Sequence, residues 1–134
     1  MAKAKSNAYP QAILDLMAEK TAILSKAHAL SEMGMAETAQ ALWASAASYE
    51  ERLAPQLDAL GRDREAAVHR ISAASCYHKA GDPSRAANLY RAALAGPLRA
   101  APRRNVQRML ADCLAELAPS APPRKRKGKV TAEA

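Results

Sequence analysis

The residues AHALSEMGMAETAQALWASAA at positions 27–47 and ASCYHKAGDPSRAANLYRAAL at positions 74–94 are two versions of one unit, aligned without gaps. Small, large, glycine, small, aromatic and small residues follow in the same order in both, as Ala27, Leu30, Gly34, Ala39, Trp43, Ala46 and as Ala74, Tyr77, Gly81, Ala86, Tyr90, Ala93. Small residues let paired helices approach closely, aromatic residues fill the space between pairs, and glycine permits a tight turn. The pattern therefore predicts a helical hairpin that occurs twice.

The composition around these units favours helices and a thin core. The chain has 134 residues, the length of one ordinary domain. It contains 34 alanines, three valines, three isoleucines and no phenylalanine, a set that favours helix over strand. We therefore expect an all-α fold of about five helices. No apolar run approaches the roughly 18 residues that a membrane span requires, so no membrane segment is predicted.

Glycines and prolines divide the chain into the predicted helices. These run from about residue 10 to Glu32, from about Ala36 to Leu60, from Asp63 to a turn at Gly81, from Pro83 to Gly96-Pro97, and from after Pro102 to Leu117. Asp63 is predicted to cap the third helix, and Asp82 with Pro83 to begin the fourth. Because proline removes a backbone donor, Pro55 predicts a kink or a break near Leu53.

The two ends differ in composition from the helical domain, which is predicted over residues 9–118. Residues 1–8 are small and polar and are expected to be flexible, while the Pro/Lys/Arg-rich residues 119–134 are expected to be disordered. Asp15 and Glu19 interrupt the position where the apolar stretch of a signal peptide would lie, which favours a cytoplasmic location. Cys76 and Cys113 are then expected to be reduced thiols in small core positions. The enrichment in alanine and arginine can also follow from a GC-rich, bacterial genome, in which case the basic charge has no consequence for binding.

The two units resemble the tetratricopeptide repeat family, with Gly81-Asp82-Pro83 in place of its turn. The resemblance covers about half of the chain. Gly34 and Gly81 lie 47 residues apart, whereas the family period is about 34 residues, so the second helix is expected to overrun. The last helix would then be either a terminal cap or half of a third repeat whose missing surface another chain supplies.

This resemblance implies a non-enzymatic protein-interaction adaptor or scaffold, acting in a homo-oligomer or a larger assembly. The family usually binds its ligand on the concave face formed by the first helix of each pair. Carried over by position, that face would hold Thr21, Leu24, His28 and Ser31 from the first copy and Val68, Ile71, Ser75 and His78 from the second. The alternative is that several of these are core residues between the first and third helices. The family's carboxylate-clamping Lys and Asn positions are not matched, so a C-terminal carboxylate is not predicted as the ligand.

A second hypothesis rests on charge, because residues 62–108 carry seven more basic than acidic side chains. A phosphate-binding stripe would combine Arg99, Arg103, Arg104, Arg108, Arg124, Lys125, Arg126, Lys127 and Lys129, making the chain a nucleic-acid-associated accessory subunit. Most of the five aromatic residues occupy repeat-core positions, so base stacking is not predicted. An acidic protein partner would fit the same charge.

The sequence contains no motif that predicts catalysis. It lacks a glycine-rich phosphate loop and a nucleophile elbow. Cys76 and His78 lie about 200° apart around one helix and cannot both face one ion. No enzymatic activity, cofactor or metal site is predicted.

Overall fold

Three glycine turns fold the chain back on itself. Gly34, Gly61 and Gly81 have positive φ angles of 80°, 77° and 87°, a left-handed conformation that glycine adopts without strain. At the last of them, the Gly81 amide donates to the His78 carbonyl at 3.0 Å, and the Asp82 amide donates to the Tyr77 carbonyl at 2.9 Å. The same pair of hydrogen bonds forms at the other two turns. Each turn thus satisfies the last carbonyls of one helix and starts the next one antiparallel to it.

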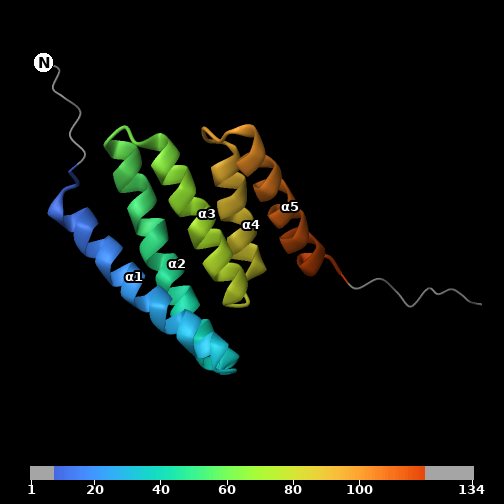
Figure 1. Cartoon of the computed structure of the whole chain (residues 1–134). Helices are drawn as coiled ribbons and strands as arrows, with labels where there is room; N and C mark the ends of the chain where they lie inside the picture. Colours follow the sequence, from blue (N-terminus) through green and yellow to red (C-terminus); the bar gives the residue numbers. More distant parts are fainter. Residues whose placement is uncertain (1–7, 120–134) are drawn as a thin grey trace, which may run out of the picture.

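The computed structural model describes residues 8–119, which form five helices and no strand (Figure 1). They are α1 (Gln11–Glu32), α2 (Ala36–Ala59), α3 (Asp63–Lys79), α4 (Pro83–Leu94) and α5 (Ala100–Leu117). The predicted all-α fold with about five helices is therefore confirmed. The expectations for residues 1–7 and 120–134 lie outside the described residues.

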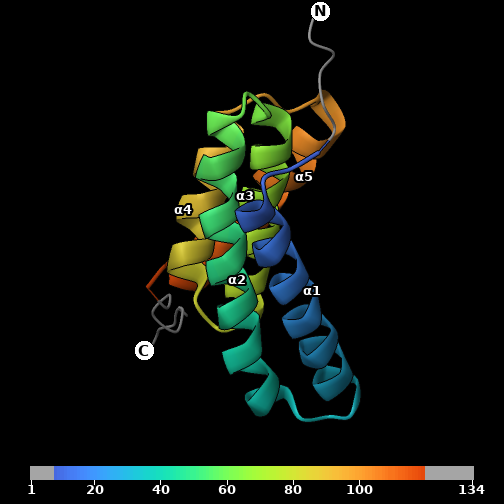
Figure 2. The ribbon, with the colours of Figure 1, turned by 90° about the vertical axis from the view of Figure 1, so that its left-hand side faces the viewer.

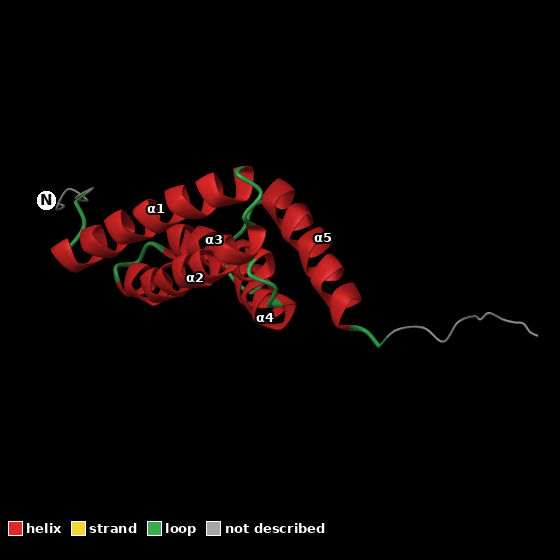
Figure 3. Cartoon of the chain, turned by 90° about the horizontal axis from the view of Figure 1, so that it is seen from below, coloured by secondary structure: helices red, strands yellow, loops and turns green. Residues whose placement is uncertain are grey.

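The helices pack mainly against their neighbours in the chain, in the order α1, α2, α3, α4, α5. As a result α1 and α5 lie at opposite ends of the array (Figures 1 and 3). Seen from the α1 end, α1 and α2 lie side by side in front of α4 and α5 (Figure 2). Among residues 8–119, this arrangement leaves one side of α1 and one side of α5 without a further helix packed against it.

The repeated residues form most of the larger of two apolar clusters. The larger cluster includes Ala27, Ala39, Trp43, Ala46, Ala74, Tyr77, Ala86 and Tyr90, all at 5% exposure or less. The smaller cluster joins the first half of α1 to the second half of α2 through Ile13, Leu16, Leu53, Ala54 and Leu57, with Ala66 from α3. Cys76 and Cys113 are free thiols buried in the larger cluster, as the sequence predicts.

A buried carboxylate links the first three helices. Glu50 on α2 is only 2% exposed. Its carboxylate lies 2.5 Å from Nδ1 of His69 on α3 and 3.9 Å from Nζ of Lys20 on α1. Because a buried carboxylate needs such partners, this cluster fixes how α1, α2 and α3 align along their axes.

Three local expectations need correction. Of the kink or break predicted near Leu53, the break is wrong, because α2 continues through Pro55 to Ala59. Pro55 and Glu51 are both exposed, so water can bond the Glu51 carbonyl that lacks a helical donor. Asp63 does not cap α3 but lies in its first turn after Arg62. Helix α5 begins at Ala100 and holds Pro102 in its first turn, where no intrahelical amide donor is needed. Asp82 does cap α4, accepting the Arg85 amide at 3.1 Å.

Candidate functional site

A pocket of about 230 Å³ opens between the N-terminal half of α3 and the segment that leads from α4 into α5. Its lining is apolar apart from two arginines. We call it the α3–α5 pocket, lined by Arg64, Val68, Ile71, Pro97, Leu98, Arg99 and Pro102. Val68 is 55% exposed and presents its apolar side chain to this hollow. Two of the eight predicted groove residues, Val68 and Ile71, therefore line this pocket.

Arg103 stabilises the connection between α4 and α5, which forms one wall of the pocket. Its guanidinium donates hydrogen bonds to the carbonyls of Leu94 at 2.8 Å, Gly96 at 3.2 Å and Leu98 at 3.3 Å. These carbonyls belong to the end of α4 and to the connection that follows it. Arg103 thus fixes the backbone path that carries Pro97 and Leu98 past α3, and its donors are directed at the protein backbone.

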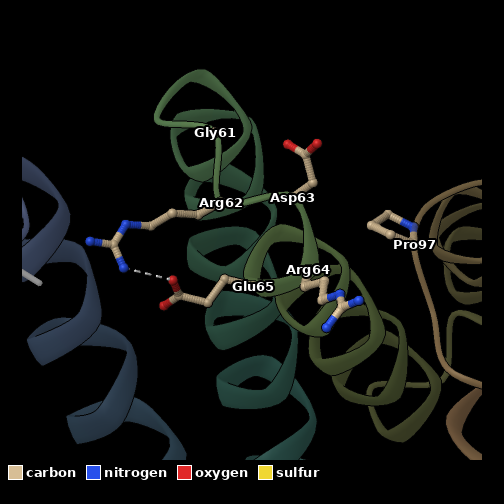
Figure 4. A pocket seen from close by; sticks show the side chains of 6 residues that line it. All are labelled: Gly61, Arg62, Asp63, Arg64, Glu65 and Pro97. Carbon is tan, nitrogen blue, oxygen red and sulfur yellow. Dashed lines mark hydrogen bonds and ion pairs between the residues drawn. The ribbon is translucent and has the colours of Figure 1, made fainter. Parts of the chain in front are cut away.

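Two arginines at the rim have no partner within residues 8–119. The side chains of Arg64 and Arg99 are exposed and make no hydrogen bond or ion pair with the described residues. By contrast, Arg62 forms an ion pair with Glu65 at 3.2 Å. Figure 4 shows Arg62 and Glu65 directed to one side of the α3 N-terminus, while Arg64 lies on the side of Pro97. The adjoining hollow in that view, of about 500 Å³, extends the pocket along the start of α3.

The predicted groove residues do not form one continuous groove. His28 and Ser31 line a separate hollow of about 390 Å³ with Trp43 and Lys79, where α1 ends and α2 begins. There the His28 ring lies edge-on to Trp43, with 4.8 Å between ring centroids, and Lys79 Nζ lies 4.5 Å from the Trp43 centroid. Thr21 is exposed and Ser75 is half-buried, and neither lines a described pocket.

The alternative prediction, that several of the eight groove residues belong to the core, holds in part for Leu24 and Ile71. Leu24 and Ile71 are half-buried and pack against the larger apolar cluster. Ile71 therefore contributes to the core with one side and to the α3–α5 pocket with another.

His78 bridges α3 to α5 and does not face the pocket. Its Nε2 lies 2.6 Å from a Glu116 carboxylate oxygen, and its Nδ1 lies 3.7 Å from the Cys113 sulfur. Burial raises the pKa of the Cys113 thiol, and the nearby Glu116 and Asp112 carboxylates raise it further. The two ring nitrogens face different partners, so Cys113 and Glu116 do not converge on one ion. No group of three His, Cys, Asp or Glu side chains within residues 8–119 is arranged to hold a metal.

The predicted basic stripe is distributed unevenly. Arg99, Arg104 and Arg108 are exposed on and next to α5, and Arg108 donates to the Asn105 side chain at 3.1 Å. Arg103 is bonded to backbone carbonyls, as described above. Arg124, Lys125, Arg126, Lys127 and Lys129 lie outside the described residues. Sequence reasoning missed Arg64, Pro97, Leu98 and Pro102, because only the docking of α5 brings their segments together.

Comparison with known proteins identifies no relative of this chain. No family model matches the chain, and no curated protein or solved structure matches it. The resemblance to tetratricopeptide repeats therefore stays a prediction that rests on the two repeated units. None of the helices within residues 8–119 is long and apolar enough to cross a membrane.

Proposed function

We propose that this chain is a non-enzymatic interaction module that binds an acidic segment of another protein in the α3–α5 pocket. The observation that carries this proposal is the exposed Val68 in an apolar hollow whose two rim arginines lack partners among the described residues. This is the adaptor role that the sequence predicts, and Val68 and Ile71 are predicted groove residues. The proposed ligand lies between α3 and α5, however, whereas the sequence predicted a groove along α1 and α3.

The size and charge of the pocket favour one apolar side chain flanked by carboxylates. A volume of about 230 Å³ is smaller than the roughly 300–1,000 Å³ of pockets that enclose a whole small-molecule ligand. Anchoring of a single side chain in such a hollow is a common way for proteins to bind each other. Arg64 and Arg99 can each offer paired donors to a carboxylate, an arrangement that suits arginine better than lysine.

The test uses a fluorescent peptide rich in glutamate that carries one leucine. Fluorescence anisotropy should show binding that weakens when serine replaces the leucine or glutamine replaces the glutamates. Arg64→Glu and Arg99→Glu should each abolish binding. Arg91→Glu is the matched control, because Arg91 is exposed on α4 and lies outside the pocket. Equal binding by all three variants would show that the pocket is not the site.

A labelled single-stranded oligonucleotide separates this proposal from the nucleic-acid hypothesis. Val68→Ser removes apolar surface without changing charge, so it should weaken the peptide complex and leave electrostatic binding of phosphates unaltered. For nucleic acid, the logarithm of the binding constant would also decrease linearly with the logarithm of the salt concentration. An oligonucleotide that binds with this salt dependence, together with a peptide that does not bind, would favour the accessory-subunit hypothesis.

A further inference from the structure

The hollow of about 390 Å³ lies where α1 and α3 end and α2 begins. The turns from α1 to α2 and from α3 to α4 both lie at this edge of the molecule (Figures 1 and 2). We call it the Trp43 hollow, lined by His28, Ser31, Ala36, Gln40, Trp43 and Lys79. Unlike the α3–α5 pocket, it falls within the range of roughly 300–1,000 Å³ that is typical of pockets for small molecules.

The lining of the Trp43 hollow is rich in hydrogen-bond donors. Lys79 carries a positive charge, and the side chains of His28, Ser31 and Gln40 can each donate a hydrogen bond. Within residues 8–119, none of these four side chains forms a hydrogen bond or an ion pair. The described residues that line the hollow include no aspartate, glutamate or arginine. The lining therefore suits a ligand that is negatively charged and accepts hydrogen bonds.

The buried indole N–H of Trp43 points independently to such a ligand. Trp43 is only 5% exposed, and a buried indole N–H usually has a hydrogen-bond acceptor. No residue between 8 and 119 accepts a hydrogen bond from it. The ring also holds the Lys79 ammonium, whose Nζ lies 4.5 Å from the ring centroid. A ligand with several acceptor oxygens can bond the N–H and pair with this charge.

The start of α2 adds a positive electrostatic potential. Ala36 is the first residue of α2 and lines the hollow, and Met35 before it provides no side-chain cap. Among the described residues, Ala39 is the first of α2 whose amide donates to a carbonyl, that of Met35 at 3.0 Å. The Glu37 carboxylate in this turn belongs to a residue that lines a neighbouring hollow and not this one. The free amides and the helix dipole therefore favour an anion here.

We propose that the Trp43 hollow binds a small organic phosphate, with the phosphoryl group between Lys79 and the start of α2. A phosphoryl group has three oxygens that accept hydrogen bonds from several sides, and lysine is a common phosphate ligand. A carboxylate fits less well, because the paired donors of arginine that suit it are lacking among the described lining residues. The proposal does not rest on the function proposed above, since the α3–α5 pocket lies at the other end of α3.

The fluorescence of Trp43 can report binding at this site, because Trp43 is the only tryptophan in the chain. Titration of the full chain with phenyl phosphate should change the emission saturably, with a dissociation constant of about 1 mM or lower. Inorganic phosphate should compete with phenyl phosphate. Benzoate carries a carboxylate on the same ring and should bind about tenfold more weakly or less.

Isothermal titration calorimetry then tests the role of Lys79. Lys79→Gln removes the charge and should raise the dissociation constant for phenyl phosphate by about tenfold or more. Lys79→Arg keeps the charge and should retain most of the binding. Lys26→Gln is the matched control, because Lys26 is exposed on α1 and lies outside the hollow. Far-UV circular dichroism should show that all three variants keep their helices.

Four results would overturn the proposal. They are the absence of a saturable response to phenyl phosphate, equal binding of benzoate, equal losses of affinity in Lys79→Gln and Lys26→Gln, and tighter binding of a phosphoserine peptide than of phenyl phosphate. The last result would assign the hollow to a phosphorylated protein partner instead of a small molecule.

Discussion

Substitution of Ala86 by leucine should disturb the packing of α4 more than any surface change of the same size. Ala86 is fully buried and belongs to the apolar cluster that also holds Tyr77 and Tyr90. Leucine adds three carbon atoms where no side of the residue is open to solvent. Overpacking of this kind typically costs about 1–3 kcal/mol. For a domain of this size, 1 kcal/mol lowers the melting temperature by about 4 °C, so a drop of about 4–12 °C is expected.

The same substitution at an exposed position of the same helix provides the control. Ala92 lies on α4 and is exposed, so Ala92→Leu should change the free energy of unfolding by less than about 0.5 kcal/mol. Thermal unfolding followed by far-UV circular dichroism measures both variants, and urea titration gives the free energies. Equal melting temperatures for the two variants would refute the placement of Ala86 inside the core and, with it, the correspondence between the two repeated units.

Three further predictions address the turns, the buried carboxylate and a thiol. Gly81→Ala should destabilise by about 1–2 kcal/mol because its φ is +87°, whereas Gly96→Ala, at a glycine without a positive φ, should cost much less by urea titration. Glu50→Ala should cost about 2–3 kcal/mol, since it leaves two partly exposed bases without their buried carboxylate, while the exposed Glu32→Ala should be nearly neutral in the same assay. Burial raises the pKa of the Cys76 thiol from 9.0 to about 11, so the unfolded chain loses this proton at a lower pH than the folded chain does. The free energy of unfolding should therefore fall as the pH rises between those two values. A Cys76→Ala variant whose free energy of unfolding falls just as steeply with pH would contradict this.

Features that depend on short stretches of sequence were predictable. The turns at Gly34 and Gly81, and the start of α4 at Asp82 and Pro83, follow from backbone preferences of a few adjacent residues. The buried aromatic residues of the repeated units follow from helical spacing. Pro55 shows the limit of such rules, because the cost of a proline inside a helix depends on whether water reaches the carbonyl that loses its donor.

The site depends on contacts that no local pattern encodes. Arg103 and Arg99 are both basic and lie four residues apart, yet Arg103 is bonded to three carbonyls, whereas the Arg99 side chain at the rim of the pocket makes no hydrogen bond or ion pair within residues 8–119. Their difference arises from the path of the chain between α4 and α5. Glu50 shows the same limit, because only the approach of α1 and α3 turns an ordinary helical glutamate into a buried charge.

Packing between successive helices has a consequence for how the molecule opens. In such an array the free energy of unfolding is close to a sum of helix and nearest-neighbour contributions, so a terminal helix can detach while the others stay folded. Release of α5 from α4 would move Leu98 and Pro102 away from α3 and take the α3–α5 pocket apart. A segment bound in the pocket would therefore oppose the release of α5. It would slow hydrogen exchange of amides throughout α5, including amides that it does not contact.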